Sequence, residues 1–461
     1  MKNIGSRSTP LGGRIWASLL VCGFIGQIAW IVENMYFSTF AQDIFENSAD
    51  YGNYYFIVTT LMVVLSAVTA TVTTVFAGAL SDKAGKRKIF ISAGYVLWGF
   101  TIMLFAALGA DPSPDEAPLV ITLLVVFDCV MTLVGSTAND AAFNAWVTDV
   151  TDSSNRGKVN TVLSVMPVLA TVAAIAVAMF TYDKGNYSAF FIVLGAIPIV
   201  CGVASAFLIK DKPGIVRSDM RSAKDVFYGF RPSVVKENKF MFVCLAALSL
   251  AGIAQQTFMS YLINFITATL GITDYILPLG TVIVLSAVIT GVFGVLYDRF
   301  GRKKFFVPLA VVMTIGTFSI YLTKFLGSGS YLPMLYVGGT VMLGSMLCTN
   351  GALMATFQDY IPKGFEGRFQ GVRMCFTVLI PMVVGPVISL AIGINSFSAN
   401  DGGVTSPPFE IFLAAAVVAL LSIVPIAFVA KDADRLRAAK TAEKETAAEE
   451  DPGIGQTENA D

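Results

Sequence analysis

Residues 78–88 read GALSDKAGKRK, and residues 294–304 read GVLYDRFGRKK. The Gly, Leu, Asp, second Gly and final Lys of these stretches coincide at a constant offset of 216 residues. A second pair recurs near an offset of 210, from Asp149 to Gly157 and from Asp359 to Arg368. Basic loops between membrane spans would explain the lysines, but not the matching Gly, Leu and Asp. The chain is therefore predicted to consist of two related halves.

The composition indicates that much of the protein surface faces lipid. Of the 461 residues, 55% are hydrophobic and 14% are charged, whereas a soluble protein has about 25% charged residues. The net charge of −1 gives no indication of a nucleic-acid partner. The chain has no histidine, its six cysteines lack metal-ligand spacing, and no nucleotide-binding loop is present. We therefore expect no metal, no cofactor and no enzymatic activity.

Apolar stretches of about 20 residues, the length that crosses a bilayer core, recur in two groups of six. The stretches are 15–40, 54–80, 89–109, 119–147, 159–181 and 187–209, followed by 240–270, 275–297, 305–326, 331–357, 370–393 and 408–430. We expect an all-α membrane protein of about twelve transmembrane helices in two pseudo-symmetric six-helix bundles. The bundles are 1–209 and 240–430, with a cytoplasmic linker at 210–239 and a disordered cytoplasmic tail at 431–461.

The basic residues predict the orientation of the spans. If the N-terminus is cytoplasmic, 29 of the 31 Lys and Arg residues lie on the cytoplasmic side, and only Lys184 and Lys324 lie on the other. This asymmetry follows the positive-inside rule. The prediction is a multi-pass protein of the cell membrane, monomeric in the bilayer, with both termini in the cytoplasm.

The doubled motif resembles the signature of the major facilitator superfamily, G-x-L-x-D-x-x-G-[RK]-[RK]-[RK], in the loop between spans two and three. The resemblance covers residues 15 to 430 and implies two bundles that rock about a central site, giving alternating access. It also implies a gate at the cytoplasmic face, because carboxylates there bind helix ends and nearby basic residues. The expected gate residues are Asp82, Arg87, Asp149, Arg156, Asp298 and Arg302.

Arg87 is a candidate partner for Asp149, and Asp149-x6-Arg156 also resembles the acid–arginine spacing of sugar-carrying members. The second half departs from this spacing, because Glu366 stands at the position of the Arg and Arg368 follows two residues later.

Two further stretches, 26–37 and 367–382, resemble bacterial glycoside–pentoside–hexuronide:cation symporters and sucrose-type carriers. In the melibiose-type members, paired acids on span two bind sodium. Span two of this chain, residues 54–80, contains no acid. We therefore expect a proton rather than sodium as the coupling ion.

Three acids lie inside the expected spans: Glu33, Asp128 and Asp140. An ionisable side chain at this depth is costly, so each is a candidate for cation coupling. No Lys or Arg is expected at comparable depth, although Asp140 lies near the cytoplasmic edge and could pair with loop arginines. The alternative for all three is a buried, hydrogen-bonded structural acid. The hypothesis is that Asp128 or Glu33 takes up a proton outside and releases it inside.

Neutral polar and aromatic side chains in the spans are candidates for substrate binding, because amides both donate to and accept from sugar hydroxyls. The alternative is that the amides join helices within the membrane. The candidates are Gln27, Trp30, Asn34, Asn139, Asn144, Gln256, Asn264 and Asn350.

The sequence thus favours a secondary active transporter, with proton-coupled symport of a sugar or glycoside as its activity. The alternative is a proton-coupled exporter of amphipathic small molecules, since the basic-loop motif is common to both. An importer of organic anions is disfavoured because no basic residue is expected inside the spans.

Overall fold

The computed structural model describes residues 11–47, 54–109, 112–113, 115–151, 156–181, 187–211, 230–361, 366–399 and 406–449. Every regular element in these ranges is helical. Within them, eleven helices are long and apolar enough to cross a membrane, and a shorter apolar helix, Val165–Thr181, occupies the fifth expected span. The all-α membrane fold expected from the sequence is confirmed.

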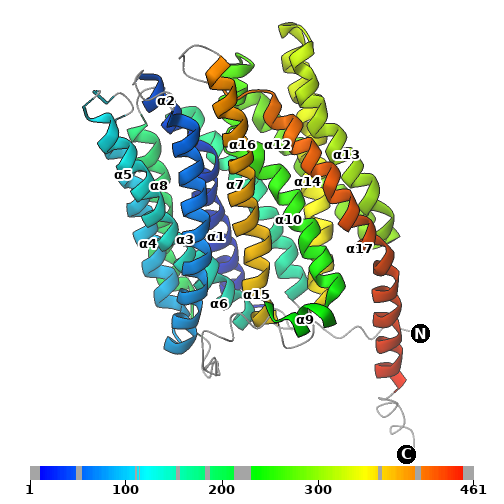
Figure 1. Cartoon of the computed structure of the whole chain (residues 1–461). Helices are drawn as coiled ribbons and strands as arrows, with labels where there is room; N and C mark the ends of the chain where they lie inside the picture. Colours follow the sequence, from blue (N-terminus) through cyan, green and yellow to red (C-terminus); the bar gives the residue numbers. More distant parts are fainter. Residues whose placement is uncertain are drawn as a thin grey trace, which may run out of the picture.

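The first half contains the helices of the first six expected spans (Figure 1). Spans one and four are each continued by π-helical turns within the apolar stretch. The elements are α1 (Gly13–Ile31), η1 (Val32–Tyr36), α2 (Phe37–Asn47), α3 (Tyr55–Ala84), α4 (Arg87–Leu104), α5 (Ala117–Gly135), η4 (Ser136–Phe143), α6 (Asn144–Val150), α7 (Arg156–Thr181) and α8 (Ser188–Leu208).

The second half contains the helices of the last six expected spans, with π-helical turns in its first and fifth spans. A short helix within the expected linker, α9 (Pro232–Glu237), precedes it. The remaining elements are α10 (Lys239–Met259), α11 (Leu262–Asn264), η7 (Phe265–Thr269), α12 (Ile276–Phe300), α13 (Lys303–Leu322), α14 (Tyr331–Tyr360), α15 (Glu366–Met374), η10 (Cys375–Leu379), α16 (Ile380–Ala399) and α17 (Glu410–Glu449).

The second glycine of each repeated motif ends a long helix. Gly85 has φ 63° and caps α3, with its N–H donating to the Ser81 carbonyl. Gly301 has φ 81° and caps α12, with its N–H donating to the Tyr297 carbonyl. Residues that have a Cβ rarely adopt a positive φ angle, so glycine is favoured at both positions. We call the end of the bundle that carries these two loops the motif face.

The structure differs from the prediction of a disordered tail that begins at residue 431. α17 continues as one helix through Glu449, well beyond the expected boundary at residue 431. The residues after 431 are rich in Ala, Glu, Lys and Arg, which have high helix propensity, so the helix extends past the apolar stretch. Residues 450–461 lie outside the described part of the chain.

The two halves lie side by side, and α3 and α7 of the first half contact α16 and α12 of the second (Figure 1). The outer surface carries many exposed apolar side chains, including Phe180, Phe207 and Val295. Such an exposed apolar belt is expected where helices face lipid instead of water. Within this packing, Glu33 of span one and Asp128 of span four line a pocket to which the second half also contributes.

Candidate functional site

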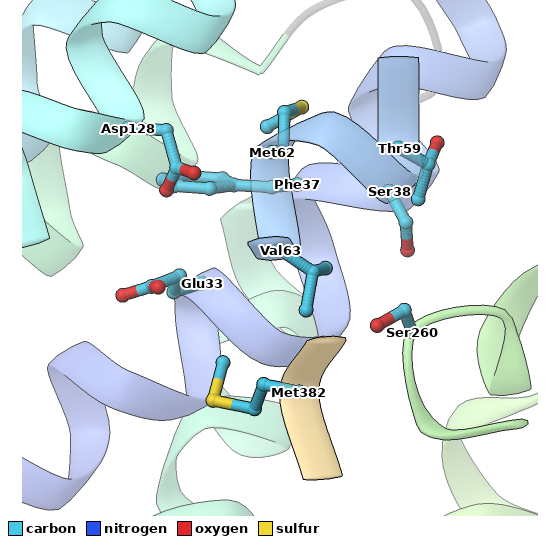
Figure 2. A pocket seen from close by; sticks show the side chains of 9 residues that line it. All are labelled: Glu33, Phe37, Ser38, Thr59, Met62, Val63, Asp128, Ser260 and Met382. Carbon is cyan, nitrogen blue, oxygen red and sulfur yellow. The ribbon is translucent and has the colours of Figure 1, made fainter. Parts of the chain in front are cut away.

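A small pocket lies at the junction between the two halves (Figure 2). Its cavity volume is about 20 Å³, which holds one or two water molecules. Figure 2 shows the carboxyl groups of Glu33 and Asp128 on one side of the pocket, and Ser38, Thr59 and Ser260 on the other. The lining residues are Glu33, Phe37, Ser38, Thr59, Met62, Val63, Asp128, Ser260 and Met382. The last of these is in α16, so both halves contribute to the pocket.

Glu33 lies in η1 and receives hydrogen bonds from two neighbouring helices. Its Oε1 accepts from the Ser66 hydroxyl of α3 and from the Thr132 hydroxyl of α5, the latter at 3.3 Å. The two hydroxyl groups are themselves 2.8 Å apart. The other carboxyl oxygen, Oε2, is buried without a hydrogen-bond partner in the described part of the chain. Hydrogen bonds therefore fix only one of the two carboxyl oxygens of Glu33.

Asp128 lies in α5, one helical turn before Thr132, and is 1% exposed. Its Oδ1 is also buried and has no hydrogen-bond partner among the described residues. The Glu33 carboxylate acts on Asp128 electrostatically. A buried carboxylate needs compensation by a proton, a cation or hydrogen-bond donors. The unpartnered oxygens of these two acids are therefore suited to holding an exchangeable cation.

Asp140 lies in η4 and is more fully bonded than the other two acids. It accepts from the Ser136 hydroxyl at 3.1 Å and from Asn139 Nδ2 at 3.2 Å. The Arg373 guanidinium lies close enough to act on it electrostatically. The expectation that no basic residue lies at comparable depth is wrong for this acid. Because α15 begins at Glu366, Arg373 lies about two turns inside the helix.

Several of the amides proposed to bind substrate make hydrogen bonds within the protein. Asn139 Oδ1 is 2.9 Å from the Tyr95 hydroxyl, and the exposed Asn144 donates to the Asp140 carbonyl. Asn350 donates to Gln255 Oε1 at 3.2 Å, which joins α14 to α10. These contacts fit the alternative that amides join helices, and the substrate-binding role of these residues stays a prediction.

Asn264 connects the two halves. It is fully buried, and its Nδ2 donates to the Ser38 carbonyl at 3.1 Å and to the Tyr55 hydroxyl. Nearby, the Tyr261 hydroxyl is 3.5 Å from the Thr60 hydroxyl. We call Ser38, Tyr55, Thr60, Tyr261 and Asn264 the interhalf seal. It lies toward the end of the bundle opposite the motif face, because Tyr55 is the first residue of α3 and α3 ends at the motif face.

Among the side chains that the structure describes, the remaining candidates for substrate binding do not line the pocket. Trp30 is half-buried and packs edge-on against Trp98, with ring centroids 5.0 Å apart. Gln27 is half-buried in α1. Gln256 packs against Gly385 of α16, and its Oε1 has no hydrogen-bond partner in the described ranges. The side chain of Asn34 lies outside the described part of the structure.

At the motif face, each half contains an arginine–aspartate pair. Arg87 Nε is 3.1 Å from Asp149 Oδ2, and Arg302 Nη1 is 2.8 Å from Asp359 Oδ2. In the register of the repeat Arg302 corresponds to Lys86 instead of Arg87, so the pairs are similar but not equivalent. The side chains of Asp82, Arg156 and Asp298 lie outside those that the structure describes.

Sequence reasoning overlooked Ser66 and Arg373. A single serine in the apolar span two gives only a weak signal, because small hydroxyl residues often bond to their own helix. Arg373 counts among the cytoplasmic basic residues in the sequence, because it lies close to the expected start of its span at residue 370. Only the packing of α3 and α5 shows that Ser66 and Thr132 meet at Glu33.

Comparisons with known proteins show which fold this is. The family model described as Major Facilitator Superfamily matches residues 19–386 and 279–455. A search of curated protein sequences found no match. Among solved structures, the chain is similar to a bacterial homologue of the human lysosomal transporter Spinster in an inward-facing, occupied conformation. The TM-score is 0.67 at 12% identity, over 92% of this chain and 98% of that one.

Two further similar structures are those of transporters. The inward-open xylose transporter XylE from E. coli has a TM-score of 0.62 at 12% identity, over 88% of this chain and 95% of that chain. A point mutant of the nucleoside transporter NupG has a TM-score of 0.61 at 13% identity, over 90% of this chain and 99% of that chain. At such identities the likeness concerns the fold alone.

Proposed function

The chain belongs to the major facilitator superfamily, and from this premise we propose that it carries a sugar or glycoside in symport with a proton. The expected orientation, with both termini in the cytoplasm of the cell, makes the motif face the inner one. The structures of a xylose transporter and of a D-xylose–proton symporter show that this fold accommodates such a combination of solute and ion.

The observation that carries the proposal is the pair of acids in the pocket. Glu33 and Asp128 come from spans one and four, each has a buried oxygen without a hydrogen-bond partner in the described ranges, and both line one cavity. A proton bound there is shielded from bulk water until the halves move apart. Its binding neutralises a charge at the junction between the halves, which favours closure of the junction.

The solute must bind when the junction is wider, because the pocket as observed has room only for water. The hydroxyl groups of Ser38, Thr59 and Ser260 face the acids across the pocket (Figure 2). When the halves separate, Trp30, Gln27 and Gln256 border the enlarged space. Hydroxyls, amides and an aromatic face together suit a sugar ring.

A second candidate function is export of an amphipathic compound. Phe37, Met62, Val63 and Met382 give the pocket an apolar surface beside its polar groups, and methionine adapts to varied ligand shapes. A thermal-shift screen of the purified protein with mono- and disaccharides against lipophilic cations separates the two candidates. Stabilisation by the cations alone would replace the sugar proposal with export.

The proton-coupling proposal is tested by uptake into proteoliposomes under an imposed pH gradient, using the solute found in the screen. Glu33→Gln and Asp128→Asn should each abolish accumulation against the solute gradient, because the amide cannot carry the proton. Counterflow exchange of labelled for unlabelled solute should persist at a reduced rate. The matched control is Asp274→Asn, which neutralises an exposed acid in the loop before α12. Normal accumulation by both pocket variants would remove these acids from the coupling mechanism.

A further inference from the structure

A second cavity lies outside the junction between the halves, in the furrow between α4 and α8 at the motif face. Its volume is about 380 Å³, within the usual range of small-molecule sites, about 300 to 1,000 Å³. The lining residues are Lys86, Lys88, Ile89, Ser92, Ala93, Ala206 and Asp211. The transport mechanism proposed above uses none of them.

This cavity lies where the membrane meets water. Lys86 and Lys88 flank the first residue of the span Arg87–Ala107, and Asp211 follows the end of the span Ser188–Leu208. The charged residues therefore lie at headgroup depth, whereas Ile89, Ala93 and Ala206 lie on the apolar side of this boundary. A ligand of the cavity must have a polar part at one end and an apolar part at the other.

The furrow stays open because its two helices pack through small residues. A Cβ at Gly202 of α8 would lie 2.7 Å from the Ser92 carbonyl oxygen of α4, and one at Gly99 would lie 2.3 Å from the Gly195 carbonyl oxygen. This contact brings the helices close together along their inner faces. On the outer face, Ala93 and Ala206 are too small to fill the space between them.

The charges of the cavity favour an anion. Lys86 is exposed and Lys88 is half-exposed, and the intervening Arg87 points inward to Asp149. The one carboxylate in the lining, Asp211, accepts a hydrogen bond from the Lys88 backbone N–H at 2.9 Å. The lining thus has two lysines against one aspartate whose oxygen is already engaged.

The apolar surface continues from the cavity along both helices. Ile89 and Leu97 of α4 are 60% and 55% exposed, and Val203 and Phe207 of α8 are 52% and 73% exposed. Acyl chains can lie against these side chains while a headgroup occupies the polar end of the cavity.

We propose that this furrow is a binding site for an anionic phospholipid, with Lys86 and Lys88 bound to the headgroup phosphate. A neutral zwitterionic lipid gains less, because its own positive group opposes the lysines. The bound phosphate lies next to the Arg87–Asp149 pair, so the site can link lipid composition to the gate at the motif face.

The test is native mass spectrometry of the purified full-length protein titrated with phosphatidylglycerol, and separately with phosphatidylcholine of the same acyl chains. The wild type should bind phosphatidylglycerol preferentially. The double variant Lys86→Gln/Lys88→Gln should bind it about 30-fold more weakly. Lys236→Gln/Lys239→Gln, which removes two exposed lysines near the start of α10, should bind it like the wild type.

Two further variants keep the proposal testable if the lysine variant does not fold. Ala93→Phe fills the furrow without changing any charge and should also weaken binding. Asp211→Asn removes the negative charge but retains an oxygen to accept the Lys88 N–H, and should strengthen binding.

Equal binding of the two lipids by the wild type, or undiminished binding by both Lys86→Gln/Lys88→Gln and Ala93→Phe, would overturn the site. If inorganic phosphate at constant ionic strength displaces the lipid and stabilises the protein as much as phosphatidylglycerol does, the ligand is free phosphate and the lipid assignment is wrong.

Discussion

The Tyr95 hydroxyl lies 2.7 Å from the Cys22 carbonyl oxygen and 2.9 Å from Asn139 Oδ1, and Asn139 in turn donates to Asp140. This chain of contacts joins spans one, three and four behind the pocket. Cys22, Tyr95 and Asn139 are buried, and an unsatisfied buried polar group costs about 1 to 3 kcal/mol. The network therefore holds Asp140 in one position, while Glu33 and Asp128 retain oxygens without partners among the described residues.

Gly26 is the position where this network is most easily disturbed. A Cβ at residue 26 would lie 2.5 Å from Asn139 Oδ1 and 2.7 Å from the Tyr95 hydroxyl oxygen. Gly26→Ala should therefore destabilise the protein by about 1 to 3 kcal/mol, since overpacking displaces both groups. Thermal unfolding in detergent measures the effect. Gly291→Ala is the matched control, because a Cβ there meets nothing within 4 Å, and an equal loss in both variants would contradict the packing argument.

At the scale of elements, the π-helical turns coincide with functional candidates. Glu33 lies in η1, Asp140 lies in η4, and η7 follows Asn264. A π turn inserts an extra residue into a helix and changes the direction of the side chains beyond it, which is why such turns are frequent at functional sites. The turns allow a single span to have a lipid-facing side along one part and a pocket-facing side along another.

The two arginine–aspartate pairs at the motif face differ in burial, and this predicts unequal energetics. The Arg87 side chain is 5% exposed, whereas the Arg302 side chain is 32% exposed. Arg87→Met should cost about 3 kcal/mol, because it removes the cation that is paired with a partly buried carboxylate. Arg302→Met should cost about 1 kcal/mol or less, because water screens the exposed pair.

Reversible denaturant unfolding in mixed micelles gives both free energies of unfolding. If both variants lose the same free energy of unfolding, the difference in exposure between the two pairs does not affect their energies.

At the scale of the whole molecule, the interhalf seal joins spans one and two to span seven on the side opposite the motif face. Its hydrogen bonds are uncharged, and Thr60 also donates to the Pro386 carbonyl of α16 at 3.3 Å. Neutral hydrogen bonds contribute about 0.5 to 1.5 kcal/mol each. A few of them can stabilise one conformation without preventing its exchange with another.

Asn264→Ala removes two of these hydrogen bonds and should shift the equilibrium toward separation of the halves at this end, by about five- to 150-fold. Pulsed electron paramagnetic resonance measures the shift as a change in the distance between nitroxide labels at Leu119 and Leu277. Both side chains are exposed in the first turns of α5 and α12. The matched control is Asn350→Ala, which breaks a hydrogen bond within the second half. An unchanged distance distribution in Asn264→Ala would show that the seal does not control opening.

The sequence by itself determined the membrane-spanning helices, the two related halves and the presence of three acids in the first half. These properties depend on the length and hydropathy of local segments, and Gly85 and Gly301 end their helices at equivalent positions of the repeat. The tertiary structure alone decided that Glu33 meets Ser66 and Thr132, that Arg373 approaches Asp140, and that Asn264 joins the halves. The reason is physical: lipid and protein interior are both apolar, so hydropathy does not say which face of a span meets which neighbour.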